Sequence, residues 1–341
     1  MPHDHDGWVL SFKKHVQIEW KVIELFADNW LQLIQNETFD VIALRPPGRS
    51  SFYKQIYDDR MQFLSSLYPE KLYPNVDLVK VYENKRYFRD WLLVNKIPHP
   101  KTWIFYSKEH ALQFLNVNKD FPLVSKLNIG ASGKGVEIIN NKKQVIQEIS
   151  QLFGDGKVIK GTPNIRKGSI IKKIKKIFTN PAFIKYRLKE YQQQSNEVHK
   201  NYIILQEFIK HAFEWRCVVI GDSYFAHKKL IKSGKTSGSL LKEYENPPIS
   251  LLNFIRNLSL NHNIDSAAID IFEHNETYLV NEIQCFFGQS DEHQMIINKV
   301  PGRYLWKDKN WSFEKGSFNE NECFDLRLKH ILEKFGKNSK K

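Results

Sequence analysis

The sequence predicts a mixed α/β fold of the α+β kind, built from two or three modules. Its 341 residues are too many for one ordinary domain, and a hydrophobic fraction of 41% is enough for more than one core. Segments with helical spacing of apolar residues alternate with short apolar runs that are typical of strands. No apolar run approaches the roughly 20 residues of a membrane span. The N-terminus shows no secretory signal, and the few, widely spaced cysteines fit a reducing cytoplasm, so we expect a cytoplasmic protein.

One stretch, Ser266–Ser290, organises the rest of the chain. Two apolar runs, Ala267–Phe272 and Tyr278–Ile283, flank the polar residues Glu273–Glu276. Apolar runs of this length around a short polar segment predict a β-hairpin.

Three side chains with oxygen atoms lie in these otherwise apolar strands: Asp270, Glu282 and Gln284. Because strand side chains alternate between faces, Glu282 and Gln284 share one face. A three-residue loop, His274–Glu276, would place Asp270 one diagonal from Glu282. Two carboxylates and an amide in an apolar sheet are costly unless a cation neutralises them, and hard oxygen ligands suit Mg²⁺. We therefore expect these three residues to bind Mg²⁺; the alternative is a hairpin with one solvated face.

The net charge of +13 is concentrated in one segment. Lys157–Lys189 contains eleven basic residues and no acidic residue, so +11 of the +13 lies there. Its partner should be anionic: a substrate, a membrane surface contacted peripherally through 157–189, or nucleic acid. We do not expect nucleic acid, because the segment lacks a helix-turn-helix or RNA-recognition context. The alternative is a solvated helix face packed on a domain.

The three cysteines, Cys217, Cys285 and Cys323, are too few and too widely spaced for a disulfide framework or a zinc site. Cys217 and Cys285 lie in apolar runs, which predicts buried thiols. The tail from Asn298 carries no chemical motif.

The N-terminal part predicts helix over most of 8–36 and a buried strand at Phe39–Leu44. The basic turn that follows, Arg45–Ser51, is a usual place for a ligand in an α/β sheet, although it could be a plain surface turn. A helix is expected over Asn84–Lys96. The prolines in 97–100 end it, because the residue before a proline avoids the helical region.

A glycine-containing loop, Asn128–Gly135, follows a buried strand that carries Lys126. Backbone N–H groups of such a loop can close over phosphates. It is not a Walker loop, because Gly135 follows Lys134 and a strand comes next. A plain hairpin turn and a surface lysine are the alternatives.

Taken in order, these features resemble the ATP-grasp superfamily over about Lys85–Gln289. The resemblance implies two α+β subdomains that clasp ATP, preceded by a smaller α/β domain. The implied domains are an N-terminal domain at 1–98, a first ATP-grasp subdomain at 99–205 with a basic insert at 154–195, and a second subdomain at 206–341.

The resemblance also implies roles for single residues. The residues implied in ATP binding are two phosphate-binding lysines, the glycine loop, an adenine-reading hinge and a ribose-binding acid: Lys85, Lys126, Gly130, Ser132, Gly133, Gln206, Glu207, Phe208, Ile209 and Glu214. The implied catalytic cations, which hold the γ-phosphate and acyl-phosphate oxygens, are Arg216, Lys228, Lys229 and Lys235. The implied metal ligands are again Asp270, Glu282 and Gln284.

The sequence departs from the family pattern at two positions. Gln284 stands where the last metal ligand is usually Asn. Ala268 stands where D-alanine–D-alanine ligases carry an arginine, which argues against that branch. The chain is more similar to glutamate-adding ligases of the ribosomal-protein type and to capsule-cluster ATP-grasp proteins, whose Arg-Ala-Ser-Gly-Ser loop resembles Lys235–Ser239.

The resemblance implies an ADP-forming ligase that uses ATP and Mg²⁺ to activate an anionic carboxylate substrate as an acyl phosphate for attack by an amine. Arg45–Ser51 and Ser237–Ser239 are expected to line the acceptor pocket. The alternatives are a kinase that phosphorylates a polyanionic small molecule, and a non-catalytic protein that binds polyanions or membranes. The sequence indicates no general base and no oligomeric state.

Overall fold

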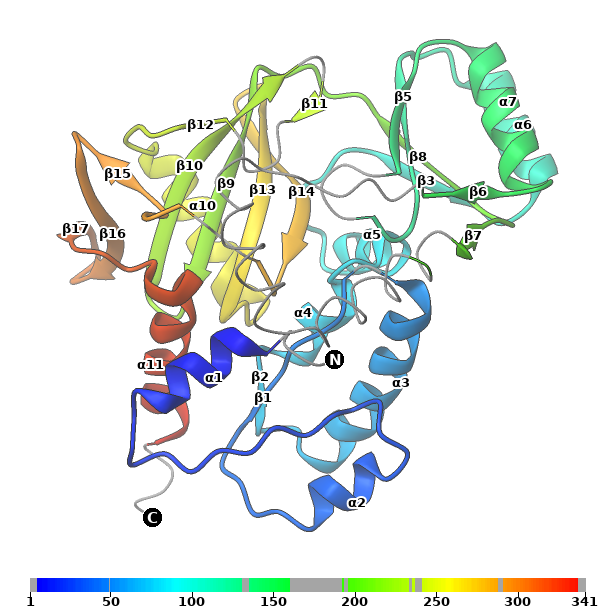
Figure 1. The fold of residues 1–341 in the computed structure, drawn as a ribbon. Helices are drawn as coiled ribbons and strands as arrows, with labels where there is room; N and C mark the ends of the chain where they lie inside the picture. The colour runs from blue at the N-terminus through cyan, green and yellow to red at the C-terminus, as the bar shows by residue number, and fades with distance from the viewer. Residues whose placement is uncertain are drawn as a thin grey trace. The chain divides into compact units, whose positions relative to one another are not determined.

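The computed structural model describes residues 5–48, 50–130, 135–159, 192, 196–232, 235–236, 241–287 and 291–336. These residues fall into two compact units (Figure 1). The first contains Pro47–Gln55 and Lys101–Phe208, and the second contains Asp6–Pro46, Ile56–Pro100 and the chain from Ile209 onward. Most of the first hundred residues thus share a unit with the last third of the chain. The division at 98 and 205 that the sequence suggests remains a prediction.

The second unit is built around a large antiparallel sheet. Within the described residues this sheet has nine strands in the order β14-β13-β9-β10-β16-β15, with β11 and β12 paired to β10 and β17 paired to β16. The strands are β9 (Phe213–Ile220), β10 (Ser223–Lys232), β11 (Lys235–Thr236), β12 (Lys242–Glu243), β13 (Ser266–His274), β14 (Thr277–Gln284), β15 (Ile296–Ile297), β16 (Val300–Lys307) and β17 (Asn310–Lys315). A separate parallel pair consists of β1 (Ile42–Ala43) and β2 (Leu72–Tyr73). The helices are α1 (Asp6–Lys13), α2 (Trp30–Gln35), α3 (Ser51–Leu67, which begins in the first unit), α4 (Val76–Val81), α5 (Lys85–Val94), α10 (Ile249–Asn261), the 3₁₀ turn η1 (Glu320–Cys323) and α11 (Phe324–Phe335).

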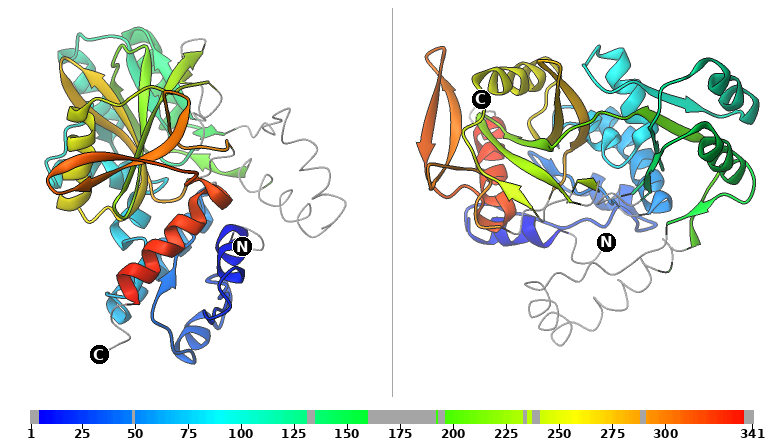
Figure 2. Two further views of the ribbon diagram at one scale, coloured as in Figure 1. Left: turned by 90° about the vertical axis from the view of Figure 1, so that its left-hand side faces the viewer. Right: turned by 90° about the horizontal axis from the view of Figure 1, so that it is seen from above.

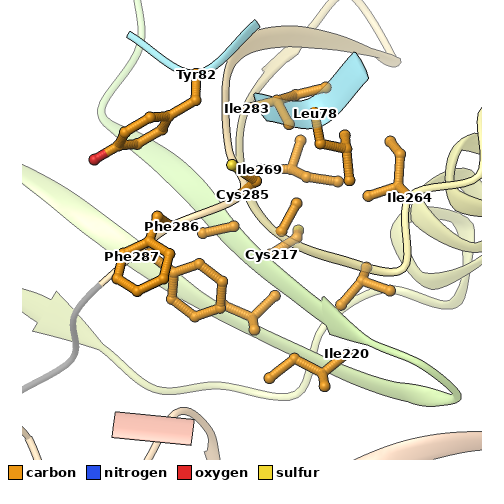
Figure 3. Packing of buried hydrophobic residues seen from close by; sticks show 14 of the residues in the cluster. Leu78, Tyr82, Cys217, Ile220, Ile264, Ile269, Ile283, Cys285, Phe286 and Phe287 are labelled. Carbon is orange, nitrogen blue, oxygen red and sulfur yellow. The ribbon is translucent and has the colours of Figure 1, made fainter. Parts of the chain in front are cut away.

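Helix α10 covers one face of this sheet, and α1 lies beside α11 (Figure 2). The buried residues of α10 recur at helical spacing, so they form one apolar stripe: Leu251, Leu252, Ile255 and Leu258. They belong to one buried cluster with the strand side chains Cys217, Ile269, Ile271 and Ile283. Leu78 of α4 joins the same cluster beside Ile269 and Ile283 (Figure 3). The opposite face of these strands is therefore the one that can carry polar groups.

Two tight turns set the register of the central strands. Gly221-Asp222 joins β9 to β10, with Ile220 opposite Ser223. The predicted hairpin of β13 and β14 is also confirmed, but its loop is shorter than expected. His274 pairs with Thr277, so the loop is Asn275-Glu276 and not His274–Glu276. Asn275 and Glu276 have positive φ angles of 48° and 59°, as in the two-residue hairpin turns whose twist matches that of the strands.

The first unit carries a smaller sheet with two helices on one face. Within the described residues its strands run β3-β8-β4-β5, all antiparallel. The elements are β3 (Thr102–Phe105), α6 (Lys108–Val117), β4 (Leu123–Lys126), β5 (Val136–Ile139), α7 (Lys142–Leu152), β8 (Ile203–Glu207) and a separate pair, β6 (Lys157–Val158) with β7 (Val198–His199). Ser107 caps α6, because its hydroxyl accepts the backbone N–H of His110. Leu115 and Ile149 of the helices pack with Leu123 and Leu205 of the sheet.

One predicted element near the N-terminus is wrong, and another is shorter than expected. Residues 8–36 are not mostly helical: α1 ends at Lys13 and α2 begins at Trp30. Between them His15–Val22 alternates polar and apolar residues, which cannot keep one helix face apolar. The strand expected at Phe39–Leu44 shortens to β1.

The mixed α+β class is confirmed, and so are the buried thiols, because Cys217 and Cys285 are both free and buried. In the part of the chain that the structure describes, no helix combines the length and hydropathy needed to cross a bilayer.

We expect Ile269→Ala to lower the free energy of unfolding by about 3 kcal/mol, because truncation of a core isoleucine leaves a cavity. Ile269 is 0% exposed within the α10 cluster. Val117→Ala is the control, since Val117 is 77% exposed, and it should change the value by less than about 0.5 kcal/mol. Urea unfolding measures both; equal effects would contradict the assignment of the apolar face.

Candidate active site

A row of polar side chains crosses the large sheet on the face opposite α10. Arg216 of β9 lies directly opposite Asp270 of β13, and Asp270 lies directly opposite Glu282 of β14. On the neighbouring strand β10, His227 lies directly opposite Arg216. Directly opposite residues in an antiparallel sheet share a face. The four side chains therefore form one row across four strands.

Hydrogen bonds connect this row to the neighbouring residues. Lys229 Nζ donates to Asp270 Oδ2 at 2.7 Å and to Glu214 Oε2 at 3.0 Å. Arg216 donates to both carboxylate oxygens of Asp270, at 3.2 and 3.1 Å, and to Gln284 Oε1 at 2.8 Å. Five of the residues that the sequence singled out thus share one bonded network.

A β-bulge at Asn281 brings Glu282 to this face. From the turn to Val280 the two strands pair without interruption, and Asp270 then pairs with Glu282, so Asn281 is skipped. A regular hairpin would pair Asp270 with Asn281 and turn Glu282 to the other face. The sequence does carry a sign of the extra residue: Val280 and Ile283 are both buried, and a spacing of three breaks the alternation of a regular strand.

The charges of this network persist at neutral pH. Burial would by itself raise the pKa of Asp270, but Arg216 and Lys229 outweigh it and hold that pKa below its ordinary value. Burial would lower the pKa of Lys229, but Asp270 and Glu214 outweigh it and raise that pKa. The face therefore carries fixed positive and negative groups in contact.

His227 is a neutral member of the row. Burial, followed by the charges of Lys242 and Arg216, lowers the pKa of His227 to about 3. Its Nδ1 lies 2.9 Å from the backbone oxygen of Gln294, so this nitrogen carries the proton. A neutral imidazole avoids a third cation beside Arg216 and Lys229.

Lys228 does not join the network. Adjacent strand residues point to opposite faces, so Lys228 and Lys229 are separated by the sheet itself. Lys228 Nζ pairs with Glu245 at 2.6 Å and lies 4.1 Å from the centre of the Phe213 ring. The sequence treats the two lysines as a pair, but the structure brings only Lys229 to Arg216.

The carboxylates of Asp270 and Glu282 fit the hard oxygen ligands that Mg²⁺ prefers. They lie directly opposite each other, and within the described part of the chain Glu282 forms no side-chain hydrogen bond or ion pair. Among these residues no three His, Cys, Asp or Glu side chains gather as a ready metal site. A bound Mg²⁺ would therefore take its other ligands from Gln284, water or phosphate oxygens, as it commonly does.

A second group of predicted residues belongs to the first unit. Lys126 and Gln206 lie on the face of the small sheet away from α6 and α7. Gln206 Nε2 donates to Thr102 Oγ1 at 3.0 Å, and the Glu207 carboxylate accepts the backbone N–H of Lys101 at 2.7 Å. The side chains of Gln206 and Glu207 thus bond the start of the predicted hinge to the neighbouring residues Lys101 and Thr102.

The predicted hinge runs across the boundary between the units. Phe208 is the last residue of the first unit in this part of the chain, and Ile209 begins the next segment of the second.

Lys85, at the start of α5, has a buried Nζ with no hydrogen-bond partner among the described residues. A buried polar group without a partner is costly, so this ammonium suits an anionic ligand.

Several predicted positions fall where the structure gives no side chain. Ser132 and Gly133 lie outside the described residues, as do Ser237–Ser239 and residues 160–191 of the basic segment. Lys235 lies on β11 opposite Lys232, and its side chain is also outside the described part. Gly130, at the start of the glycine loop, is described and buried.

No protein-family model and no curated protein sequence matches the chain. Solved structures do match it. A RimK-domain ATP-grasp protein from Sphaerobacter thermophilus is 11% identical, with 83% of this chain and 87% of that chain covered and a TM-score of 0.48. A D-alanine–D-alanine ligase from Bacillus anthracis is 15% identical, with 100% of this chain and 96% of that chain covered and a TM-score of 0.52.

The chain has the ATP-grasp fold. At such low identity the likeness establishes the fold and not the reaction. The ATP-grasp fold is thus confirmed as predicted, while the roles assigned to single residues remain predictions.

Two residues of the polar sheet face opposite α10 were not singled out from the sequence. Asn281, the bulge residue, donates through Nδ2 to Glu214 Oε1 at 3.4 Å. His227 stands next to Arg216 in the row, and nothing in its sequence context distinguishes it from an ordinary core histidine. Only the break in alternation at Asn281 could have been found in the sequence.

We expect Asp270→Asn to lower the free energy of unfolding by about 3 kcal/mol at neutral pH, because it leaves Lys229 and Arg216 buried with one negative partner fewer. The folded pKa of Asp270 lies below the ordinary value of 3.8. The carboxylate therefore contributes its stability above that value and loses it as the pH falls through the folded pKa. The difference between wild type and variant should be constant between about pH 6 and 8 and shrink toward about pH 3. Urea unfolding across this range measures it, and a difference that does not shrink would contradict the ion-pair assignment.

Proposed function

We propose that the protein is an ATP- and Mg²⁺-dependent ligase that joins a carboxylate to an amine and releases ADP and phosphate. The observation that supports this proposal best is the row Arg216–Asp270–Glu282 with Lys229 bonded to it, on one sheet face of an ATP-grasp fold. Asp270 bonds directly to cations suited to phosphates, and Glu282 lies opposite Asp270 as a second acid suited to a metal. The Bacillus anthracis protein of the same fold is named as a ligase.

The chemical difficulty of such a reaction is the approach of two anions. Two unit charges 4 Å apart repel by about 4 kcal/mol near a protein surface. Arg216 and Lys229 can offset this repulsion at the transferred phosphoryl group. Asp270 holds both cations in place, so little reorganisation is needed when negative charge develops between the reactants.

The reaction would proceed in two steps. A carboxylate oxygen of the substrate forms a bond to the γ-phosphorus of ATP, the bond from that phosphorus to the bridging oxygen breaks, and ADP leaves. The amine nitrogen then attacks the acyl carbon, and the carbon–oxygen bond to phosphate breaks. Arg216 and Lys229 would hold the phosphoryl oxygens through both steps.

The remaining predicted residues would position the nucleotide. Lys85 and Lys126 would bind phosphate oxygens, the backbone of Gln206–Ile209 would contact adenine, and Glu214 would contact the ribose. Asp270, Glu282 and Gln284 would hold Mg²⁺, which supplies neutralising charge at the phosphates when bound. These assignments are part of the proposal.

We expect Glu282→Ala and Lys126→Ala each to lower the rate of ADP and phosphate release by about 100-fold or more, because each removes charge stabilisation at the phosphates. Lys228→Met is the matched control and should stay within about threefold of wild type, since Lys228 faces away from the network. The assay supplies ATP, Mg²⁺ and a panel of amino acids and short acidic peptides. A Lys228 variant as impaired as the Glu282 variant would contradict the face assignment, and an unimpaired Glu282 variant would contradict the site.

The products distinguish the ligase from the alternatives. A ligase releases ADP and free phosphate in equal amounts, whereas a kinase releases ADP and retains the phosphate on its product. A non-catalytic polyanion binder would instead show salt-sensitive binding to anionic vesicles or oligonucleotides that is indifferent to ATP.

A further inference from the structure

Two arginines lie near one aromatic ring, that of Phe286, just beyond the candidate metal residues. Phe286 lies two positions after Gln284, the last residue of β14, where the chain bends. Its neighbour Arg327 donates to Ser266 of β13, which lies on the same sheet face as Asp270. The guanidinium carbon of Arg45 lies 3.7 Å from the centre of the Phe286 ring. The guanidinium carbon of Arg327, from α11, lies 5.6 Å from the same centre. A concentrated positive charge thus adjoins the proposed active face within the second unit.

The charge of Arg327 is not neutralised by a neighbouring acid. Arg327 is 1% exposed, its Nε donates to Ser266 Oγ at 3.2 Å, and its Nη1 donates to the backbone oxygen of Glu322 at 3.4 Å. Its buried Nη2 has no hydrogen-bond partner, and no carboxylate pairs with Arg327 among the described residues. Burial lowers the pKa of Arg327, and the groups that act on its charge include no carboxylate: Cys323, Tyr73, Cys285 and Arg45.

Arg45 is the accessible member of the pair. It is half-buried, and its backbone N–H donates to the hydroxyl of buried Tyr57 at 3.1 Å. Its Nη1 donates to the backbone oxygen of Pro46 at 2.6 Å. Stacking on Phe286 occupies the face of the guanidinium and directs its N–H groups sideways. A planar fork held in this way matches the geometry of a carboxylate.

We propose that Arg45 determines substrate specificity by binding a second carboxylate of the substrate, with the charge of the neighbouring Arg327 strengthening the site. Ser266, which accepts a hydrogen bond from Arg327, lies four residues from Asp270 on β13, which is about 13 Å along an extended strand. The substrate class is therefore an elongated dianion. One carboxylate is activated beside Asp270 and Glu282, and the other is held roughly 13 Å away. This inference rests on the ligase function proposed above.

The test measures binding of α,ω-dicarboxylates to the full chain in the presence of Mg²⁺ and a nonhydrolysable ATP analogue. Succinate, suberate and sebacate bracket the relevant lengths, and their monomethyl esters are the matched probes with one charge removed. Suberate and sebacate should raise the melting temperature more than their esters do, and succinate should not. Arg45→Gln should abolish this difference and weaken sebacate binding about tenfold or more, the loss expected for a charged hydrogen-bonded contact.

Two further variants keep the test decisive if Arg45→Gln folds poorly. Arg45→Lys keeps the charge but not the planar fork, and it should reduce the difference between diacid and ester. Phe286→Leu keeps both arginines, and it should weaken sebacate binding less than Arg45→Gln does.

The outcomes separate this inference from the proposed function. Equal effects of diacids and esters on wild type, or a difference that survives Arg45→Gln, would overturn the inference. Failure of the proposed function would appear differently, as no thermal shift by the nucleotide analogue and Mg²⁺ in the wild type. The shift caused by the nucleotide alone should be the same in wild type and Arg45→Gln.

Discussion

The candidate site depends on one buried contact, that of Asp270 with Lys229 and Arg216. Asp270 is 2% exposed, and Lys229 is 7% exposed. Desolvation penalises each of these charges taken alone, so each is tolerable only because the others neutralise it. The contact joins β9, β10 and β13, and it fixes the orientation of the two cations that would meet a phosphoryl group. The same interaction therefore joins three strands of the sheet and positions the charged groups of the candidate site.

The two faces of the sheet show how period-two alternation divides structure from function. On one face, isoleucines and Cys217 of the strands join the apolar stripe of α10 in one core cluster. On the other face, the same strands present an unbroken set of charged and amide groups from Glu214 to Gln284. Lys228 and Lys229 are neighbours in sequence but lie on opposite faces, where Lys228 pairs with Glu245 and Lys229 pairs with Asp270. The apolar face provides the rigidity that the polar face needs.

Local signals in the sequence identified the hairpin and its polar side chains, because both depend on patterns within a few residues. The fold was identified from the order of several such signals over about Lys85–Gln289. The separation of Lys228 from Lys229 followed from the same alternation, but the resemblance to a family grouped them together. Arg327 could not have been found this way. It contacts Ser266 and Phe286, which are 61 and 41 positions away in sequence, and the tail that contains it carries no motif.

The bulge at Asn281 has a consequence for comparing this chain with others. Only one strand of the hairpin holds an extra residue, so a relative with a regular hairpin is one position shorter between its turn and its second acid. An alignment without a gap at Asn281 would match the second acid of such a relative with Asn281 instead of Glu282. Every later position of the strand would then be matched with a residue of the opposite face. Homologues of this protein will be recognised by their facing carboxylates only where the gap is opened there.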